Sequence, residues 1–196
     1  MSDSTAHAVV AVVTRVNGGR LEALVHRVER RRGEALEAAL ARAVDVASLS
    51  HVEQLDTRVL AAGALATTYL GLTRAGDSPA GPWRSVDARR DADERKLVAT
   101  AVARLRAKLS YTNLGFALAP DVFTISELRE VYVAALGYDV SATNLQRVLV
   151  RRGAIVRADG QRAPGRTGGR PAALYRFAAQ RLEVTDEFAA LRPPTH

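Results

Sequence analysis

Two runs of apolar residues open the chain, on either side of Asn17-Gly18-Gly19, a turn signal that joins antiparallel strands. The runs read AVVAVVTRV and LEALVHRV within His7 to Arg30 and predict a β-hairpin. From Glu34 to Val46 the apolar residues recur at helical spacing, which predicts a helix. The apolar stretch Val59 to Leu72 becomes β-prone towards its end. The segment Arg74 to Asp87 contains Gly, Pro and Ser and is expected to be a loop.

A long amphipathic helix is predicted from Asp91 to Ser110, because its apolar residues fall along one side. A chain of 196 residues allows one large domain or two small ones. We place a domain boundary near Arg89, so that residues 1–89 form one domain and residues 90–196 the other. The apolar side of the helix consists of Leu97, Val98, Ala101, Leu105 and Leu109.

Two short helices are predicted next. Thr124 and Glu127 have the T-x-x-E spacing of a capping box, in which each side chain satisfies a free backbone N–H of the first turn. Gly137 is placed to end this helix in a left-handed conformation. After a short turn, Ser141 can cap a second helix that runs to about Arg152.

The second helix has an apolar face and an opposite polar stripe when successive residues are turned by about 100°. Arginine can hold guanine O6 and N7, and asparagine can hold adenine N6 and N7, each through two hydrogen bonds. A helix of this pattern suits the major groove of DNA. Val150 fits neither face. The apolar face consists of Leu145, Val148 and Leu149, and the polar stripe of Asn144, Arg147 and Arg151.

Two strands complete this region. Ala154 to Arg157 is predicted to be a short strand, Asp159-Gly160 is a turn signal, and Ala172 to Phe177 is predicted to be the returning strand. Two helices followed by two strands around a loop are the order of a winged helix-turn-helix, a DNA-reading module. The loop contains Gly, Pro and Thr, no carboxylate, and the three arginines Arg162, Arg166 and Arg170.

Charge supports the same interpretation. From Ser141 to Arg181 nine arginines stand against one acidic residue, Asp159, which gives this segment a net charge of +8. The whole chain carries +7, so the remainder carries −1. A solvated surface could hold arginines, but nine like charges in one segment repel each other unless an anion binds them. The candidate DNA-binding residues are Thr143, Asn144, Gln146, Arg147, Arg151, Arg152, Arg162, Arg166 and Arg170.

Other chemistry is not visible in the sequence. Without cysteine the chain has no disulfide, thiol chemistry or zinc finger. Its four histidines are scattered without i, i+4 pairing, and no G-x-S-x-G, Walker loop or G-x-G-x-x-G appears. The run Ala8 to Val13 is too short for the apolar part of a signal peptide and no basic stretch precedes it, so we expect no signal peptide. No run approaches the ~18 apolar residues of a membrane span. We expect a soluble cytoplasmic protein that does not bind membranes.

Three segments of the C-terminal half resemble one family. They read DERKLVATAVARLRAKLSYT (Asp93 to Thr112), FALAPDVFTISELREVYVAALG (Phe116 to Gly137) and TGGRPAALYRF (Thr167 to Phe177). Together they resemble the Nudix-related transcriptional regulators of NAD metabolism, which join an N-terminal Nudix-like domain to a C-terminal winged helix. The resemblance implies an α+β chain, in which a truncated Nudix-like α/β domain precedes a winged helix-turn-helix domain.

The N-terminal half resembles the family in shorter segments. GEALEAALARA (Gly33 to Ala43) looks like the start of a Nudix box, and HVEQLDT (His51 to Thr57) like the strand after it. ATTYLGL (Ala66 to Leu72) and PWRSVD (Pro82 to Asp87) look like later core segments. The usual proline-glycine-glycine turn before the box is absent, so this domain resembles a shortened Nudix fold.

The box itself departs from the pattern G-x5-E-x7-R-E-U-x-E-E-x-G-U, in which U is aliphatic. The box glutamates hold Mg²⁺, which prefers carboxylate oxygens. Aligning Arg42 with the box arginine puts Glu34 at the first glutamate. The next three glutamate positions hold Ala43, Val46 and Ala47. We therefore expect no enzymatic activity, no catalytic residue, no bound metal and no cofactor.

We interpret the chain as a sequence-specific DNA-binding transcriptional regulator. The resemblance implies a homodimer on palindromic double-stranded DNA and repression of NAD biosynthesis or salvage genes. It also implies a nucleotide effector such as ADP-ribose, which we do not carry over because its pocket belongs to the shortened domain. Residues 1–89 are expected to serve dimerisation. Two alternatives stay open: a non-enzymatic partner that forms a heterodimer with a full-length relative, and a nucleotide-pyrophosphate hydrolase acting on ADP-ribose.

Overall fold

The computed structural model describes residues 6–59, 63–163 and 171–186, and its contacts divide the chain into two compact units. The first unit ends at Leu105 and the second begins at Arg106. This division falls within a helix, C-terminal to the boundary near Arg89 that the sequence suggests. The helix α2 (Ala92–Leu109) contributes residues to both units, and its composition does not change at the division. The sequence therefore carries no signal for this boundary.

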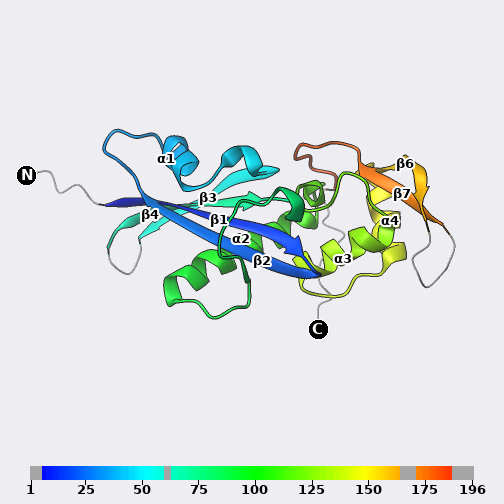
Figure 1. Ribbon diagram of the computed structural model, residues 1–196, viewed down its shortest axis with the longest axis horizontal. Coiled ribbons are helices and arrows are strands. Elements are labelled where there is room, and N and C mark those ends of the chain that lie inside the picture. Colours follow the sequence, from blue (N-terminus) through cyan, green and yellow to red (C-terminus); the bar gives the residue numbers. More distant parts are fainter. Residues whose placement is uncertain (1–5, 60–62, 164–170, 187–196) are drawn as a thin grey trace, which may run out of the picture. The chain divides into compact units, whose positions relative to one another are not determined.

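A five-stranded mixed sheet forms the centre of the first unit (Figure 1). Its strand order is β3-β4-β1-β2-β5, in which β1 pairs parallel with β4 and the other neighbours are antiparallel. The strands are β1 (His7–Asn17), β2 (Arg20–Glu29), β3 (His51–Val59), β4 (Leu65–Leu72) and β5 (Arg84–Ser85).

The predicted hairpin is confirmed in β1 and β2. Asn17 pairs with Arg20, and Gly18 and Gly19 between them both have positive φ (55° and 72°), as a two-residue hairpin turn requires. The residues from Ala8 to Val13 are no more than 1% exposed. A central strand covered on both faces has no polar side, which explains why this run is continuously apolar rather than alternating.

The sheet lies between helices. α1 (Leu36–Ala43) packs Leu40 against Val9, Val13 and Leu24 on one face. In Figure 1 the part of α2 (Ala92–Leu109) that belongs to this unit lies on the other face. α1 is shorter than the predicted 34–46 because Val44 turns to an extended conformation. This unit also contains two short 3₁₀ helices: η1 (Val46–Ser48) follows α1, and η2 (Ala75–Asp77) follows β4.

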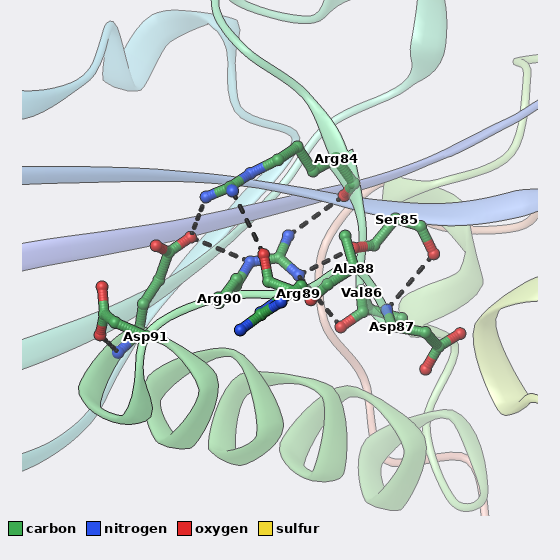
Figure 2. Close-up of polar contacts among 9 residues, drawn as sticks. Arg84, Ser85, Val86, Asp87, Ala88, Arg89, Arg90 and Asp91 are labelled. Carbon is green, nitrogen blue, oxygen red and sulfur yellow. Dashed lines mark hydrogen bonds and ion pairs between the residues drawn. The ribbon is translucent and has the colours of Figure 1, made fainter.

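A buried arginine holds the start of α2 (Figure 2). The Arg90 side chain, 1% exposed, donates hydrogen bonds from Nη1 to the backbone carbonyls of Ser85, Val86 and Ala88. Its Nε donates to Glu94 Oε1 at 2.9 Å. A guanidinium presents several donors in a fixed plane, so one side chain can close this turn and attach it to the first turn of the helix.

The second unit contains two helices and a two-stranded sheet in the order that the sequence predicts. Its core includes the ring pair Phe123 and Phe177, whose centroids are 5.4 Å apart, and the fully buried Tyr132. The backbone of Phe123 pairs with Tyr175 of the sheet. The elements are η3 (Leu114–Ala117), α3 (Ile125–Leu136), α4 (Ala142–Arg151), β6 (Ile155–Arg162) and β7 (Ala172–Phe177).

The position of the hairpin turn in this sheet was predicted wrongly. β6 continues through Asp159-Gly160 instead of turning there. The pairing register with β7 shifts between Arg157 and Gln161, so the dipeptide lies at an irregularity inside the strand. Gly160 has a φ of 86°, a value suited to a bulge. The same dipeptide serves turns and bulges, and only the pairing of Gln161 with Ala173 distinguishes them.

Candidate DNA-binding interface

The helix-turn-helix is built by local signals. Thr124 and Glu127 form the predicted capping box: Glu127 N donates to Thr124 Oγ1 at 3.2 Å and Thr124 N donates to Glu127 Oε2 at 2.7 Å. Gly137 ends α3 in the left-handed region, with φ 80°. A Cβ on Gly137 would meet the Arg106 guanidinium at 2.5 Å. The left-handed conformation favours glycine here, whereas the close approach only requires the flexible end of the Arg106 side chain to move.

α4 presents the polar stripe that the sequence predicts. Ser141 caps its N-terminus by accepting a hydrogen bond from Asn144 N, and three aliphatic residues are buried on its inner face. Arg147 Nη2 donates to Asn144 Oδ1 at 2.8 Å, so these two exposed side chains orient each other. The inner residues are Leu145, Val148 and Leu149; the exposed ones include Thr143, Asn144, Arg147 and Arg151.

Two candidate residues are held inside the domain. Gln146 donates a hydrogen bond from Nε2 to the Tyr175 hydroxyl at 2.8 Å and is half-buried. Arg152 is 3% exposed in its side chain and forms an ion pair with Asp186 at 2.7 Å. Because a guanidinium in that position cannot reach a phosphate or a base, Arg152 has to be removed from the candidate set. Its partner lies 34 residues away, beyond the range of any local pattern.

The strands after α4 add further cations. Arg162 at the end of β6 pairs with Glu127 of the α3 capping box at 3.2 Å, and both side chains are about half-exposed. Arg157 and Arg176 are exposed on β6 and β7 and were not among the sequence candidates. Both lie in strands that the sequence predicts, within the arginine-rich segment from Ser141 to Arg181, so the sequence contained a signal for them. The other two candidate residues of the loop, Arg166 and Arg170, lie outside the described residues.

The segment that resembles the start of a Nudix box contains an ion pair between Glu34 and Arg42. Arg42 donates from Nε to Glu34 Oε1 and from Nη2 to Glu34 Oε2, at 2.8 and 2.9 Å. Glu34 also accepts from the backbone N–H of Arg31. These hydrogen bonds, that from Arg42 foremost, lower the pKa of Glu34 to about 2. Both carboxylate oxygens are therefore engaged with donors of the chain itself.

The part of the chain that the structure describes contains no group of three or more acidic or histidine side chains placed to hold a metal ion. Within the same residues, no helix combines the length and the apolar character that a bilayer span requires.

Comparison with known proteins finds a domain family that is similar to part of the second unit. Residues 115–177 match the NrtR DNA-binding winged helix domain. The ADPR responsive transcriptional repressor NtrR of Acinetobacter baylyi is 36% identical over 88 residues, which are 45% of this chain. The match spans 34% of the length of that curated relative.

Solved structures show the same fold over most of the chain. NrtR of Shewanella oneidensis in complex with a 27mer DNA superposes with a TM-score of 0.70 at 22% identity, over 87% of this chain and 92% of that one. A MutT/nudix family protein of Enterococcus faecalis superposes with a TM-score of 0.66 at 14% identity, over 91% and 90%. The expected fold, a Nudix-like domain followed by a winged helix, is confirmed.

Proposed function

Since this chain is a relative of the Nudix-related transcriptional regulators, we propose that it binds specific DNA sites and regulates transcription. The observation that carries the proposal is the exposed stripe on α4. Asn144, Arg147 and Arg151 lie on one side of a capped helix inside a domain of the NrtR winged helix type. Arginine and asparagine are the side chains that most readily read guanine and adenine in the major groove.

We propose a role for each candidate residue from its residue type and its place in the chain. Arg147 and Asn144 read base edges, with Thr143 and Arg151 beside them. Arg162, together with Arg166 and Arg170 of the loop, holds phosphate or the minor groove. Gln146 supports the surface from inside through Tyr175. Phosphate contacts of the loop supply affinity that depends on salt, and the stripe on α4 supplies the choice of sequence.

The biological setting is taken from the relatives. The Acinetobacter protein is named a transcriptional repressor, which supports repression, and NAD-metabolism genes are the targets that the family resemblance suggests. Two chains on a palindromic site, in the cytoplasm, complete this proposal. The same relative is named ADPR responsive, so ADP-ribose is the effector to test first. Its binding here would have to proceed without the three box glutamates that Ala43, Val46 and Ala47 replace.

Catalysis is not part of the proposal. Mg²⁺-dependent cleavage of a pyrophosphate needs several carboxylates on the metal. Of the four box positions only Glu34 is acidic, and its two oxygens accept hydrogen bonds from Arg42 and from the backbone of Arg31. We therefore propose that the Nudix-like domain has a non-enzymatic role.

The experiment starts from a DNA site that the full chain selects from a random library. Arg147→Ala should weaken binding to that site by roughly 1–3 kcal/mol and relax the choice of base at one position. Arg162→Ala should weaken binding to selected and random DNA alike and lower the salt dependence by about one unit of slope. Fluorescence anisotropy over a salt series measures both quantities.

The control is Arg20→Ala, which removes one exposed arginine from the turn of the first unit. It should leave affinity and base choice unchanged. If Arg147→Ala behaved like this control while Arg162→Ala altered base choice, the two roles would be assigned to the wrong residues. If the unmodified chain selected no sequence at all, the proposed function itself would be wrong.

A further inference from the structure

A segment beyond the family-matched domain is tied into the second unit. The match ends at Phe177, but the chain continues and residues 183–186 pair with residues 111–113. Thr185 N and Asp186 N both donate to the carbonyl of Tyr111, at 2.9 and 3.1 Å. Thr112 pairs with Val184 as an isolated antiparallel bridge. We call residues 178–186 the C-terminal strap.

One buried asparagine secures the middle of the strap. Asn113, 1% exposed, donates from Nδ2 to the Arg181 carbonyl at 2.8 Å and accepts from Glu183 N through Oδ1 at 2.8 Å. Its own backbone N–H donates to the Glu183 carbonyl at 3.1 Å. A buried amide with this many satisfied partners fixes one arrangement of the chain around it.

The Asp186 side chain of the strap contacts the end of α4. Asp186 Oδ2 accepts from Arg152 Nη2 at 2.7 Å and from Arg152 Nε at 3.1 Å. Arg152 Nη2 also donates to the carbonyl of Ser110, at 3.1 Å. Arg152 is the C-cap residue of α4, and Ser110 follows the last residue of α2. One guanidinium therefore joins the end of α4 to the end of α2 and to the strap.

Burial of the Arg152 guanidinium costs free energy, and the Asp186 carboxylate offsets that cost. The Arg152 side chain is 3% exposed and that of Asp186 is 15% exposed. A guanidinium in such a site is tolerated only when a carboxylate neutralises it, and removal of one partner leaves an uncompensated charge that drives the side chain towards water. Without Asp186, the guanidinium would leave its place next to Ser110 and the end of α4 would lose its anchor.

We propose that Arg152 and Asp186 are positioning residues for DNA reading, which makes the C-terminal strap part of the DNA-reading unit. This inference rests on the function proposed above. Arg147 lies on the helix that Arg152 anchors, and hydrogen bonds to base edges depend on position to within a fraction of an ångström. A shift of α4 therefore weakens base contacts, whereas phosphate contacts made by long arginines adapt to it.

The test compares DNA affinities of the full chain and of full-length Asp186→Asn. The readout is the ratio of the affinity for the selected site to the affinity for a scrambled site of equal length. Partial unfolding lowers both affinities by the same factor and leaves the ratio unchanged, so the ratio separates positioning from stability. We expect this ratio to fall about tenfold or more in Asp186→Asn, within the range by which specific binding exceeds non-specific binding.

Arg181→Gln is the matched control, because it changes the same strap but removes only an ion pair to Glu183 from a side chain that is 84% exposed. Its ratio should equal that of the unmodified chain. If circular dichroism shows that Asp186→Asn does not fold, the same affinity ratio is measured for the double variant Arg152→Met/Asp186→Leu. This variant removes the anchor to Ser110 and leaves no buried charge.

An unchanged ratio in folded Asp186→Asn or in the double variant overturns the inference. In the double variant, which removes Arg152, an equal loss of affinity for both DNA fragments with a smaller salt dependence also overturns it, since that result would make Arg152 a phosphate contact. Failure of the proposed function is a different result: the unmodified chain would then select no DNA site from the library.

Discussion

Val150 is the exposed aliphatic residue of α4. Its side chain is 48% exposed, and it lies one helical turn after Arg147, so the two are neighbours on the surface. Single exposed valines are common on proteins. On a base-reading surface, however, the 5-methyl group of thymine is an apolar partner of suitable size. We propose that such a contact accounts for a residue that fits neither the buried face nor the polar stripe.

At the residue scale we therefore expect Val150→Ala to weaken binding to the selected DNA site. Replacing one thymine of that site by deoxyuridine, which lacks the methyl group, should weaken the unmodified protein by a similar amount, on the order of 1 kcal/mol. The two changes together should cost little more than either alone, because both remove the same contact. Anisotropy titrations of the four combinations measure the coupling.

Val184→Ala is the control for this cycle, since Val184 is 64% exposed in the C-terminal strap and outside α4. It should show no coupling to any thymine. Strict additivity between Val150→Ala and deoxyuridine at every thymine of the site would contradict the methyl contact.

At the scale of elements, the ion pair between Glu34 and Arg42 stabilises the entry to α1. α1 has no side-chain N-cap, and Glu34 instead accepts from the backbone N–H of Arg31 just before the helix. The helix supplies Leu40 to the core on one face of the sheet. A residue that looks like the remainder of a metal site thus has a structural role in this chain.

The pKa of Glu34 determines how this role depends on pH. Its folded-state pKa is about 2, lowered from 4.5, so its contribution to stability is fully present above pH 4.5 and is lost as the pH falls towards 2. Urea unfolding of Glu34→Gln should therefore show a lower midpoint than the unmodified chain at pH 6. The difference should shrink as the pH is lowered from 4.5 to 3.

Glu37→Gln provides the comparison for this prediction, because Glu37 is an exposed carboxylate in the first turn of the same helix. Its unfolding midpoint should stay close to that of the unmodified chain at every pH. A difference between Glu34→Gln and the unmodified chain that grew on acidification would have the wrong sign and would contradict the ion-pair role.

At the scale of the whole molecule, one recognition helix contacts only a few base pairs. Winged and other helix-turn-helix proteins usually obtain sufficient specificity by placing two such helices on a palindromic site. The chain has one α4, and we propose that a second copy supplies the other. The Nudix-like unit, with a continuous sheet and no complete metal box, is the part available to hold two copies together.

We expect the full chain to be a dimer in solution and to bind its selected site as two chains per DNA. Light scattering of the free protein and of the complex measures both numbers. Co-expression with a full-length relative tests the heterodimer, because a mixed dimer would have a mass between those of the two homodimers. A full chain that stayed monomeric on its own selected site would contradict dimeric recognition.

The sequence predicted features whose signals lie within a few residues. The hairpin at Gly18 and Gly19, the capping box of Thr124 and Glu127, and the left-handed end of α3 at Gly137 all have the predicted geometry. Each depends on the backbone conformation of neighbouring residues, so the residue types at that spacing are sufficient to specify it. The polar stripe on α4 was predictable for the same reason, because helical period alone sets it.

Contacts between distant segments were decided only by the tertiary structure. Arg152 has the same local pattern as Arg151, but Asp186 draws it into the domain. Gly115 is required because the rings of Tyr132 and Phe177 lie 2.9 Å from where its Cβ would be. Gly160 forms a bulge instead of a turn because of the strand that pairs beside it. Sequence alone thus determined features that depend on residues within a few positions of one another. The tertiary structure decided which of those side chains remain exposed to a partner, because burial and pairing depend on residues far apart in the chain.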